Sequence, residues 1–359
     1  MVKGERQELE LFFELIRLAL GSQERLSRRP SEAEWNELFA LSQKQALIGV
    51  CFSGLERLPE DQRPTEDQIL EWFYFMQQVE RQNRLMDQHT DEATAFFRSH
   101  GFKTLILKGQ GIAQLYPFPK RRQSGDIDIW LDGGRKRIYD FARKFDKEGK
   151  LYGVNYHHIH FHLFEDAEIE AHIYPCCLNN PFLNCKLHRF FETCPPSDTE
   201  MTPTPAFNRV FILVHCFNHL TGHGVGLRQV MDYYFVLKQG FSKEEKQETL
   251  EWLQKLRLMT FAGAMMWLQK TVFGLEDKYL LVAPNEKEGR FFLEEICQTG
   301  NMGHYDERDW GSTKTPFSRF LFNLRRDAHF ALHYPQEVLW QPFFNLWLYL
   351  WRLLQGLNE

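Results

Sequence analysis

Two aspartates separated by one residue, Asp126 and Asp128, are the strongest chemical signal in this sequence. Ile127 and Ile129 alternate with them, a pattern typical of a half-buried strand whose polar face carries both carboxylates. Neighbouring carboxylates on such a face repel each other and lose hydration, and a divalent cation offsets both effects. Mg²⁺ suits this position because it accepts carboxylate oxygens, keeps several waters and bridges to substrate phosphates.

A glycine turn upstream supplies a complementary site for anions. An apolar run ends at Lys108-Gly109-Gln110-Gly111, and a helix is expected to follow. Gly109 and Gly111 allow close backbone approach, and the first N–H groups of the helix are free to bind a phosphate. Each motif alone is common in ordinary surface structure. Their occurrence together in one strand-turn-helix-strand unit, residues 105–131, predicts a phosphate and metal site.

This unit resembles the nucleotidyltransferase core of the DNA polymerase beta superfamily. More narrowly, it is similar to a family of uncharacterised bacterial nucleotidyltransferases. The resemblance is carried by Leu107-Lys108-Gly109, Tyr116-Pro117, Arg122 and Gly125-Asp126-Ile127-Asp128. It implies that Asp126 and Asp128 hold catalytic metal ions, and that the nucleotide is bound by Lys108, Gly109, Gln110, Arg122 and Gly125. Many superfamily members have Gly-Ser after the first strand, where this chain has Gly109-Gln110.

A third carboxylate, Glu170, lies in the second half of a predicted β-hairpin over residues 156–174. In the family that the chain resembles, the third metal ligand precedes a histidine by two positions in a strand, and Ile169-Glu170-Ala171-His172 matches that form. The resemblance therefore implies Glu170 as the third ligand. His172 shares its strand face and would orient Glu170 or contact the substrate.

Three histidines, His158, His160 and His162, alternate in the first half of the same hairpin. They share one face, which allows a zinc site, but alternating histidines on a wet strand are usually polar surface. Polar surface is the favoured interpretation. Their cross-strand partners depend on the hairpin register, which the sequence does not determine.

The composition is that of an ordinary globular protein, with 359 residues, 43% hydrophobic and 25% charged. A net charge of −5 argues against a broad nucleic-acid-binding surface, since such surfaces are usually basic. The 7 cysteines lack regular spacing, which favours reduced thiols, and the first residues lack the apolar core of a signal peptide. These features predict a cytoplasmic protein.

Hydrophobic periodicity divides the chain into four parts. We expect a helical N-terminal region over residues 1–100, an α/β core over 101–175, an irregular linker over 176–205 and a helical C-terminal region over 206–359. The predicted fold class is α+β, with a small mixed sheet that carries the site and helical regions on either side.

The C-terminal region contains secondary candidates for the site. His215 and His219 lie four residues apart on one expected helix, as do Arg228 and Asp232 on the next helix. The narrower family has a histidine-bearing helix, a glycine loop and a similar Arg-Asp helix here, so these residues could close over the site. The alternative is an ordinary ion pair between Arg228 and Asp232, and the histidine pair lacks the adjacent Glu of a zinc protease.

The segment over residues 340–354 is strongly aromatic and apolar. Its uninterrupted apolar part is shorter than the roughly 18 residues that span a bilayer, and Arg352 interrupts it. No transmembrane segment is predicted. A buried terminal helix is favoured over an interfacial helix or a partner-binding face.

These observations predict a Mg²⁺-dependent nucleotidyltransferase that binds ATP or another NTP, with Mn²⁺ as a possible substitute for Mg²⁺. The acceptor is left open among a small molecule, an RNA end and a protein. One alternative is a catalytically weak nucleotide-binding or protein-interaction module on the same fold. A second alternative is a metal-dependent hydrolase that uses the histidine-rich strand.

Overall fold

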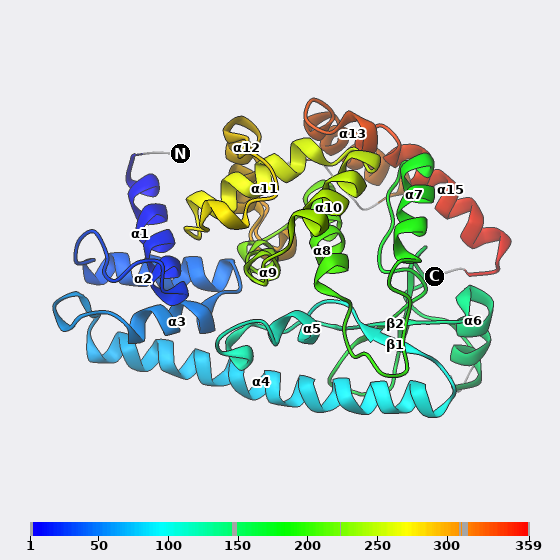
Figure 1. Ribbon diagram of the computed structural model, residues 1–359, viewed down its shortest axis with the longest axis horizontal. Helices are drawn as coiled ribbons and strands as arrows, with labels where there is room; N and C mark the ends of the chain where they lie inside the picture. The colour runs from blue at the N-terminus through cyan, green and yellow to red at the C-terminus, as the bar shows by residue number, and fades with distance from the viewer. Residues whose placement is uncertain (1–2, 146–148, 223, 309, 311–314, 358–359) are drawn as a thin grey trace.

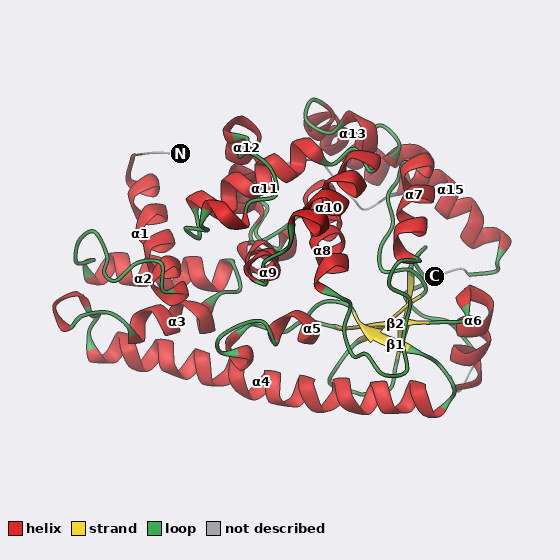
Figure 2. Ribbon diagram, viewed as in Figure 1, coloured by secondary structure: helices red, strands yellow, loops and turns green. Residues whose placement is uncertain are grey.

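Helices make up most of the molecule, and four short strands form a single sheet near one end (Figure 2). The computed structural model describes residues 3–145, 149–222, 224–308, 310 and 315–357. Among these residues, no helix has the length and apolar character needed to cross a membrane.

The N-terminal part is helical, as its periodicity predicts. It contains α1 (Lys3–Leu20), α2 (Glu32–Lys44), α3 (Ile48–Glu56) and α4 (Glu66–Ser99). Helix α4 begins with a capping box: the Thr65 side chain accepts a hydrogen bond from the backbone N–H of Gln68, and the Gln68 side chain accepts one from the backbone N–H of Thr65. It runs along the bottom of the molecule from the N-terminal helices to the sheet (Figure 1).

The sheet has the strand order β1-β2-β4-β3. Its members are β1 (Thr104–Ile106), β2 (Ile127–Leu131), β3 (His158–Phe161) and β4 (Ile169–His172). Strands β2 and β4 are parallel, whereas β1 pairs with β2 and β3 with β4 in the antiparallel sense. The small mixed sheet is therefore confirmed. The short helix α5 (Gln110–Ala113) follows β1, and α6 (Gly134–Phe145) follows β2.

The C-terminal part is a second set of helices. It contains α7 (Pro181–Phe191), α8 (Pro205–Thr221), α9 (Leu227–Lys238), α10 (Lys243–Lys255), α11 (Met259–Thr271), α12 (Glu286–Thr299), α13 (Pro316–Ala331), α14 (Pro335–Val338) and α15 (Gln341–Leu354). Helix α7 lies within the stretch that is predicted to be irregular. It forms because the Asn180 side chain caps its first N–H groups and Pro181 occupies its first turn.

The two faces of the sheet have different roles. Ile127, Ile129 and Leu131 point to one side, where they form a core with residues of α4 and α6. Asp128 and Trp130 point to the other side, and the Trp130 ring stacks on Phe207 of α8 with 6.1 Å between ring centroids. The C-terminal helices therefore cover the face that carries the carboxylates.

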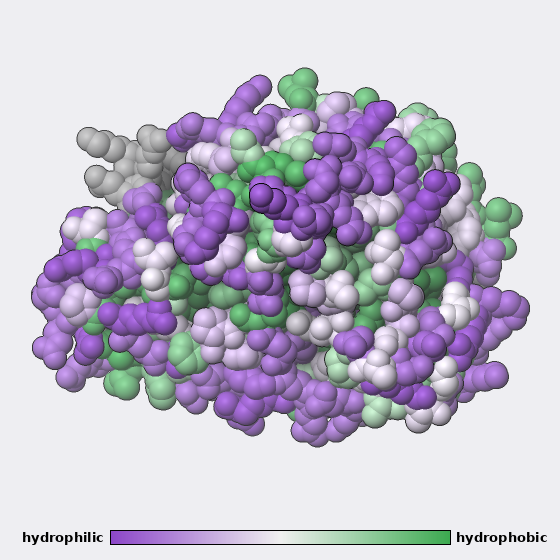
Figure 3. All heavy atoms as spheres, viewed as in Figure 1, coloured by the Kyte–Doolittle hydropathy of each residue, from purple (hydrophilic) through white to green (hydrophobic). Residues whose placement is uncertain are grey.

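The terminal helix α15 is not buried, which corrects the favoured interpretation of residues 340–354. No residue of this helix is buried, and large apolar side chains such as Phe343, Tyr349 and Leu354 are exposed. The helix lies at the edge of the molecule (Figure 1), and the guanidinium of Arg135 on α6 lies over the ring of its Trp351. Elsewhere, apolar side chains reach the surface in a band between α4 and the helices above it (Figure 3).

Candidate functional site

The parallel pairing of β2 and β4 brings two of the three predicted carboxylates together. Asp128 is opposite Glu170 in the register of these strands, and Asp128 is almost fully buried, with 1% of its surface exposed. Asp126 comes one residue before β2 begins, and its side chain is 35% exposed. The site therefore has a buried carboxylate at its centre and two more accessible ones beside it.

Lys108 joins the two aspartates. Its ammonium lies 2.8 Å from Asp128 Oδ1 and 3.7 Å from Asp126 Oδ2. Burial opposes the charge of Lys108, but the negative charges of Asp126, Asp128 and Glu170 outweigh burial and raise its pKa. Lys108 is thus a protonated internal counterion of the carboxylates, a contact that its place at the end of an apolar run does not reveal.

His172 joins Asp128 to Glu170. Its Nε2 lies 2.9 Å from Asp128 Oδ1 and 3.2 Å from Glu170 Oε2, while its Nδ1 lies 3.1 Å from the carbonyl oxygen of Tyr174. Burial disfavours the imidazolium, but the hydrogen bonds to Asp128 and Glu170 raise the pKa of His172 to about 9. Burial acts against ionised Glu170 as well, yet the hydrogen bond from His172 lowers the pKa of Glu170 to about 2.

The donor set fits a divalent cation. The three carboxylates face two cationic side chains, Lys108 and His172, so one negative charge is left over. Asp128 Oδ2 is buried, and no described residue gives it a hydrogen bond. A buried carboxylate oxygen without a partner is costly unless a cation or water is bound to it. Oxygen donors of this kind are those that Mg²⁺ prefers.

The glycine turn has the predicted tight backbone, although the helix after it is a single turn. Gly109 has φ = 57°, and a Cβ atom there would lie 3.5 Å from the carbonyl oxygen of Asp126. The side chain of Gln110 points away from the carboxylates and donates a hydrogen bond of 2.5 Å to Asp87 Oδ1 on α4. Gln110 therefore fastens the turn to α4, and its side-chain amide is engaged there instead of at the carboxylates.

Arg122 is held in a buried ion pair with Asp232 of α9. Its Nε and Nη2 each donate a hydrogen bond of 2.7 Å to this carboxylate, and the Tyr116 hydroxyl donates another of 2.7 Å. Burial opposes the charge of Arg122, but Asp232 more than compensates and raises its pKa. The structure thus brings Asp232 to Tyr116 and Arg122, which precede it by 116 and 110 positions in the chain.

Arg228 contacts the loop in front of Asp126 instead of pairing with Asp232. Its Nη1 donates a hydrogen bond of 2.8 Å to the carbonyl oxygen of Gln123, and a Cβ atom at Gly125 would lie 3.7 Å from that nitrogen. Burial and the positive charge of Arg122 lower the pKa of Arg228 to about 10, so the guanidinium remains charged near neutral pH. The helical ion pair considered from the sequence is therefore not formed.

The hairpin register places two of the alternating histidines at the site. His158 is opposite His172, and His160 is opposite Glu170. His158 is only 9% exposed, and burial together with the positive charge of His172 lowers its pKa to about 4. The interpretation as polar surface is wrong for His158 and His160, because both face Glu170. It is confirmed for His162, which is exposed beyond the end of β3.

Helix α8 places two further histidines on the covered side of the sheet. The rings of His215 and His219 lie 4.3 Å apart between centroids. Burial, followed by the charges of His219 and Lys108, lowers the pKa of His215 well below its ordinary value. His157, which the sequence does not single out, lies 5.6 Å from His172 between ring centroids. No signal in the sequence identifies His157, because its position depends on the bend before β3.

Comparison with known proteins adds one finding. Residues 31–274 match the model of a family described as uncharacterised nucleotidyltransferase, and this range is more than half of the chain. It begins just before α2 and ends just after α11, so it includes every residue of the site described above. No curated protein and no solved structure matches the chain.

Proposed function

This chain belongs to the uncharacterised nucleotidyltransferase family, and we propose that it transfers a nucleotidyl group from an NTP to an acceptor in a Mg²⁺-dependent reaction. The wider relationship that we propose is to the DNA polymerase beta superfamily. The observation that carries the proposal is the pairing of Asp128 with Glu170 across parallel strands, with a buried Asp128 oxygen that no described residue satisfies.

The three carboxylates would hold the metal. Bound Mg²⁺ supplies Lewis-acid stabilisation of phosphate charge and lowers the pKa of an acceptor hydroxyl. Asp126, Asp128 and Glu170 are the residues that would bind it. His172 orients two of them at once, because its Nε2 contacts both Asp128 and Glu170.

Other residues would bind and position the nucleotide. Lys108 and Arg228 supply positive charge beside the carboxylates, where charge develops on the phosphates during transfer. The backbone at Gly109 lacks a side chain, so a phosphate oxygen can approach its N–H groups closely. Arg122, buried against Asp232, positions the loop that leads to Asp126.

The experiment is to replace Asp128 with asparagine. Asp128→Asn keeps the size of the side chain but removes the negative charge, so we expect Mg²⁺-dependent release of pyrophosphate from NTP to fall by more than about 100-fold. Labelled NTPs incubated with the purified protein, Mg²⁺ and cell extract would provide the assay and identify the acceptor by its label. Wild-type turnover in this variant would contradict the proposal.

A matched control is Asp140→Asn on α6. Asp140 is an exposed partner of Lys136, so its loss should leave turnover unchanged. Calorimetry with NTP, with and without Mg²⁺, distinguishes the enzyme from a module that only binds. Metal-independent NTP binding without turnover would favour the binding module.

A further inference from the structure

Two histidines that the proposed nucleotidyl transfer does not use lie on the edge strand β3, and both face the carboxylate of Glu170. We propose that His158, His160 and Glu170 form a second metal site, here called the histidine site, which binds a divalent transition metal ion, with Zn²⁺ as the first candidate. The histidine site does not depend on the proposed function, although the two share Glu170.

The distances between the potential ligand atoms fit a tetrahedral ion. His158 Nδ1 lies 3.3 Å from Glu170 Oε2, and His160 Nε2 lies 3.9 Å from Glu170 Oε1. One ligand atom from each of the three residues falls within 4.8 Å of the others. With Zn–N and Zn–O bonds of about 2.0–2.2 Å, neighbouring ligands of a tetrahedral zinc lie about 3.3–3.5 Å apart. The histidine site therefore needs only small side-chain adjustments to bind an ion.

An outer carboxylate fixes the orientation of the His160 ring. Glu168 Oε1 lies 2.5 Å from His160 Nδ1, so the other ring nitrogen, Nε2, is presented to Glu170. Histidine ligands of metals commonly donate their second ring N–H to a carboxylate in this way. The ring is also confined by the backbone, because a Cβ atom at Gly153 would lie 2.3 Å from His160 Cγ.

The His158 ring offers a nitrogen that lacks another role. His158 Nδ1 is buried, and the described part of the chain provides no hydrogen bond to it. An unsatisfied buried nitrogen is costly, and a metal ion removes that cost by accepting its lone pair. This nitrogen lies 3.3 Å from Glu170 Oε2, and His158 itself is paired with His172 across strands β3 and β4.

Two imidazoles also determine which metal would bind. Nitrogen donors favour Zn²⁺ and neighbouring transition metals, whereas Mg²⁺ prefers carboxylate, carbonyl and water oxygens. Three protein ligands leave the fourth zinc position for a water or substrate atom, as in catalytic zinc sites. Because Glu170 also faces Asp128, that open position would border the carboxylate site.

The test is a titration of the full chain, freed of metal with a chelator, with Zn²⁺ and separately with Mg²⁺ in a calorimeter. We expect one tight Zn²⁺ site per chain, which His158→Ala/His160→Ala weakens by at least about 100-fold. The outer-carboxylate variant Glu168→Gln should weaken it by about 10–100-fold. Co²⁺ in place of Zn²⁺ gives a second readout, because its visible absorption reports a tetrahedral nitrogen and oxygen environment.

The matched control is His162→Ala. His162 continues the same alternation but is exposed and belongs to none of the ligand clusters among the described residues, so this variant should bind Zn²⁺ like the wild type. Unchanged Zn²⁺ affinity in the double variant, or no tight Zn²⁺ binding by the wild type, would overturn the proposal. If the double variant does not fold, His160→Ala alone decides, since the His160 side chain is 29% exposed on an edge strand.

One further variant separates the two proposals. Asp128 is not a ligand of the histidine site, so Asp128→Asn should lose nucleotidyl transfer and keep its Zn²⁺ affinity. Loss of transfer without any effect of the histidine variants on Zn²⁺ binding would leave the proposed function standing alone. If Asp128→Asn binds Zn²⁺ and also transfers nucleotide like the wild type, the histidine site stands and the proposed function is contradicted.

Discussion

Two cationic side chains offset part of the negative charge of the site when no metal is bound. Lys108 and His172 are the cations that face the carboxylates of Asp126, Asp128 and Glu170. Each cation is held in its charged form by those carboxylates in spite of burial. The metal-free protein should therefore depend on the protonation of His172 for part of its stability.

This dependence gives a pH prediction with a definite sign. The pKa of His172 is about 9 in the folded chain against an ordinary 6.5, so its contribution is complete below pH 6.5 and is lost as pH rises to 9. With a chelator present to keep the protein free of metal, the free energy of unfolding should fall over this pH range by up to about 3 kcal/mol. His172→Asn should flatten the decline, and urea unfolding at several pH values measures it. An equal decline of the unfolding free energy in His172→Asn would contradict the assignment of this pH dependence to His172.

The buried pair of Arg122 and Asp232 gives a second prediction. Asp232→Asn leaves the Arg122 guanidinium buried, at 4% exposure, without its carboxylate. Removal of one partner of a buried ion pair typically costs about 3–5 kcal/mol, and we expect a loss of this size in the free energy of unfolding. Asp140→Asn, which removes one partner of an exposed pair, should change stability little. Equal losses of unfolding free energy in Asp232→Asn and Asp140→Asn would contradict a larger contribution of the buried pair.

At the scale of elements, the sequence predicts those helices and strands that are determined by interactions between residues close in the chain. The N-terminal helices, the hairpin and helices α8 and α9 follow from periodicity and turn residues. The signals for α7 were present in Asn180 and Pro181, but the prolines and cysteines around them favour a loop. The exposure of α15 was not predictable, because an apolar helix indicates that a partner is needed without locating one.

Contacts between distant elements could not be predicted from the sequence. Arg228 and Asp232 have the spacing of a helical pair, but the structure gives Asp232 to Arg122. The reason is that a buried carboxylate gains more from a bidentate arginine across the core than from a neighbour on its own helix. In the same way, the roles of His158 and His160 depend on the hairpin register, which only the folded chain determines.

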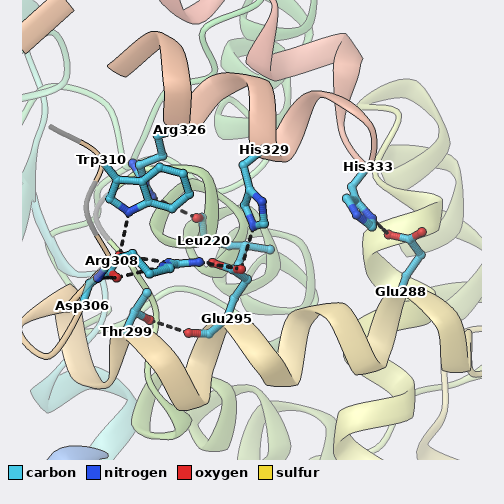
Figure 4. A network of polar contacts seen from close by, with 10 residues as sticks. All are labelled: Leu220, Glu288, Glu295, Thr299, Asp306, Arg308, Trp310, Arg326, His329 and His333. Atoms are coloured by element: carbon cyan, nitrogen blue, oxygen red, sulfur yellow. Dashed lines mark hydrogen bonds and ion pairs between the residues drawn. The ribbon is translucent and has the colours of Figure 1, made fainter. Parts of the chain in front are cut away.

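Helices α12 and α13 are joined by a polar network around Glu295 (Figure 4). This buried carboxylate accepts hydrogen bonds of 2.9 and 3.0 Å from Arg308, and His329 Nε2 of α13 lies 2.8 Å from it. Arg308 also pairs with Asp306, two residues earlier in the chain. The network therefore fixes α13 against α12, in a part of the chain that lies outside the family match.

Glu295→Ala should release α13 from this network. It removes the buried acceptor that Arg308 and His329 share, while Asp306 still pairs with Arg308, so we expect a loss of about 1–3 kcal/mol in the free energy of unfolding. Hydrogen exchange should show faster exchange of the α13 amides and little change in the sheet. The matched control is Glu294→Ala, because Glu294 is the exposed neighbour on the same helix. Equal exchange in the two variants would contradict the role of the network.

At the scale of the whole molecule, the N-terminal helices share one core with helices of the C-terminal part. Buried residues of α1 and α3 belong to the same hydrophobic cluster as residues of α8, α11 and α12. Gln45, at the end of α2, accepts a hydrogen bond of 2.8 Å from the N–H of Leu227 and donates one of 3.1 Å to the carbonyl oxygen of Ile296. The N-terminal helices therefore form part of the scaffold that places α8 and α9 over the site.

This shared core predicts that α1 is required for folding, although it precedes the residues that match the family. Five of its apolar residues are at most 2% exposed: Leu11, Phe12, Leu15, Ile16 and Leu18. At about 1.5–3 kcal/mol for each buried side chain, their burial contributes on the order of 10 kcal/mol, comparable with the whole stability of about 5–15 kcal/mol. A chain that begins at residue 31 should therefore lose cooperative thermal unfolding and its near-ultraviolet circular dichroism. A control truncated after residue 340 removes α15, which contributes no buried residue, and should keep both. A cooperative transition at the wild-type temperature in the chain without α1 would contradict the shared core.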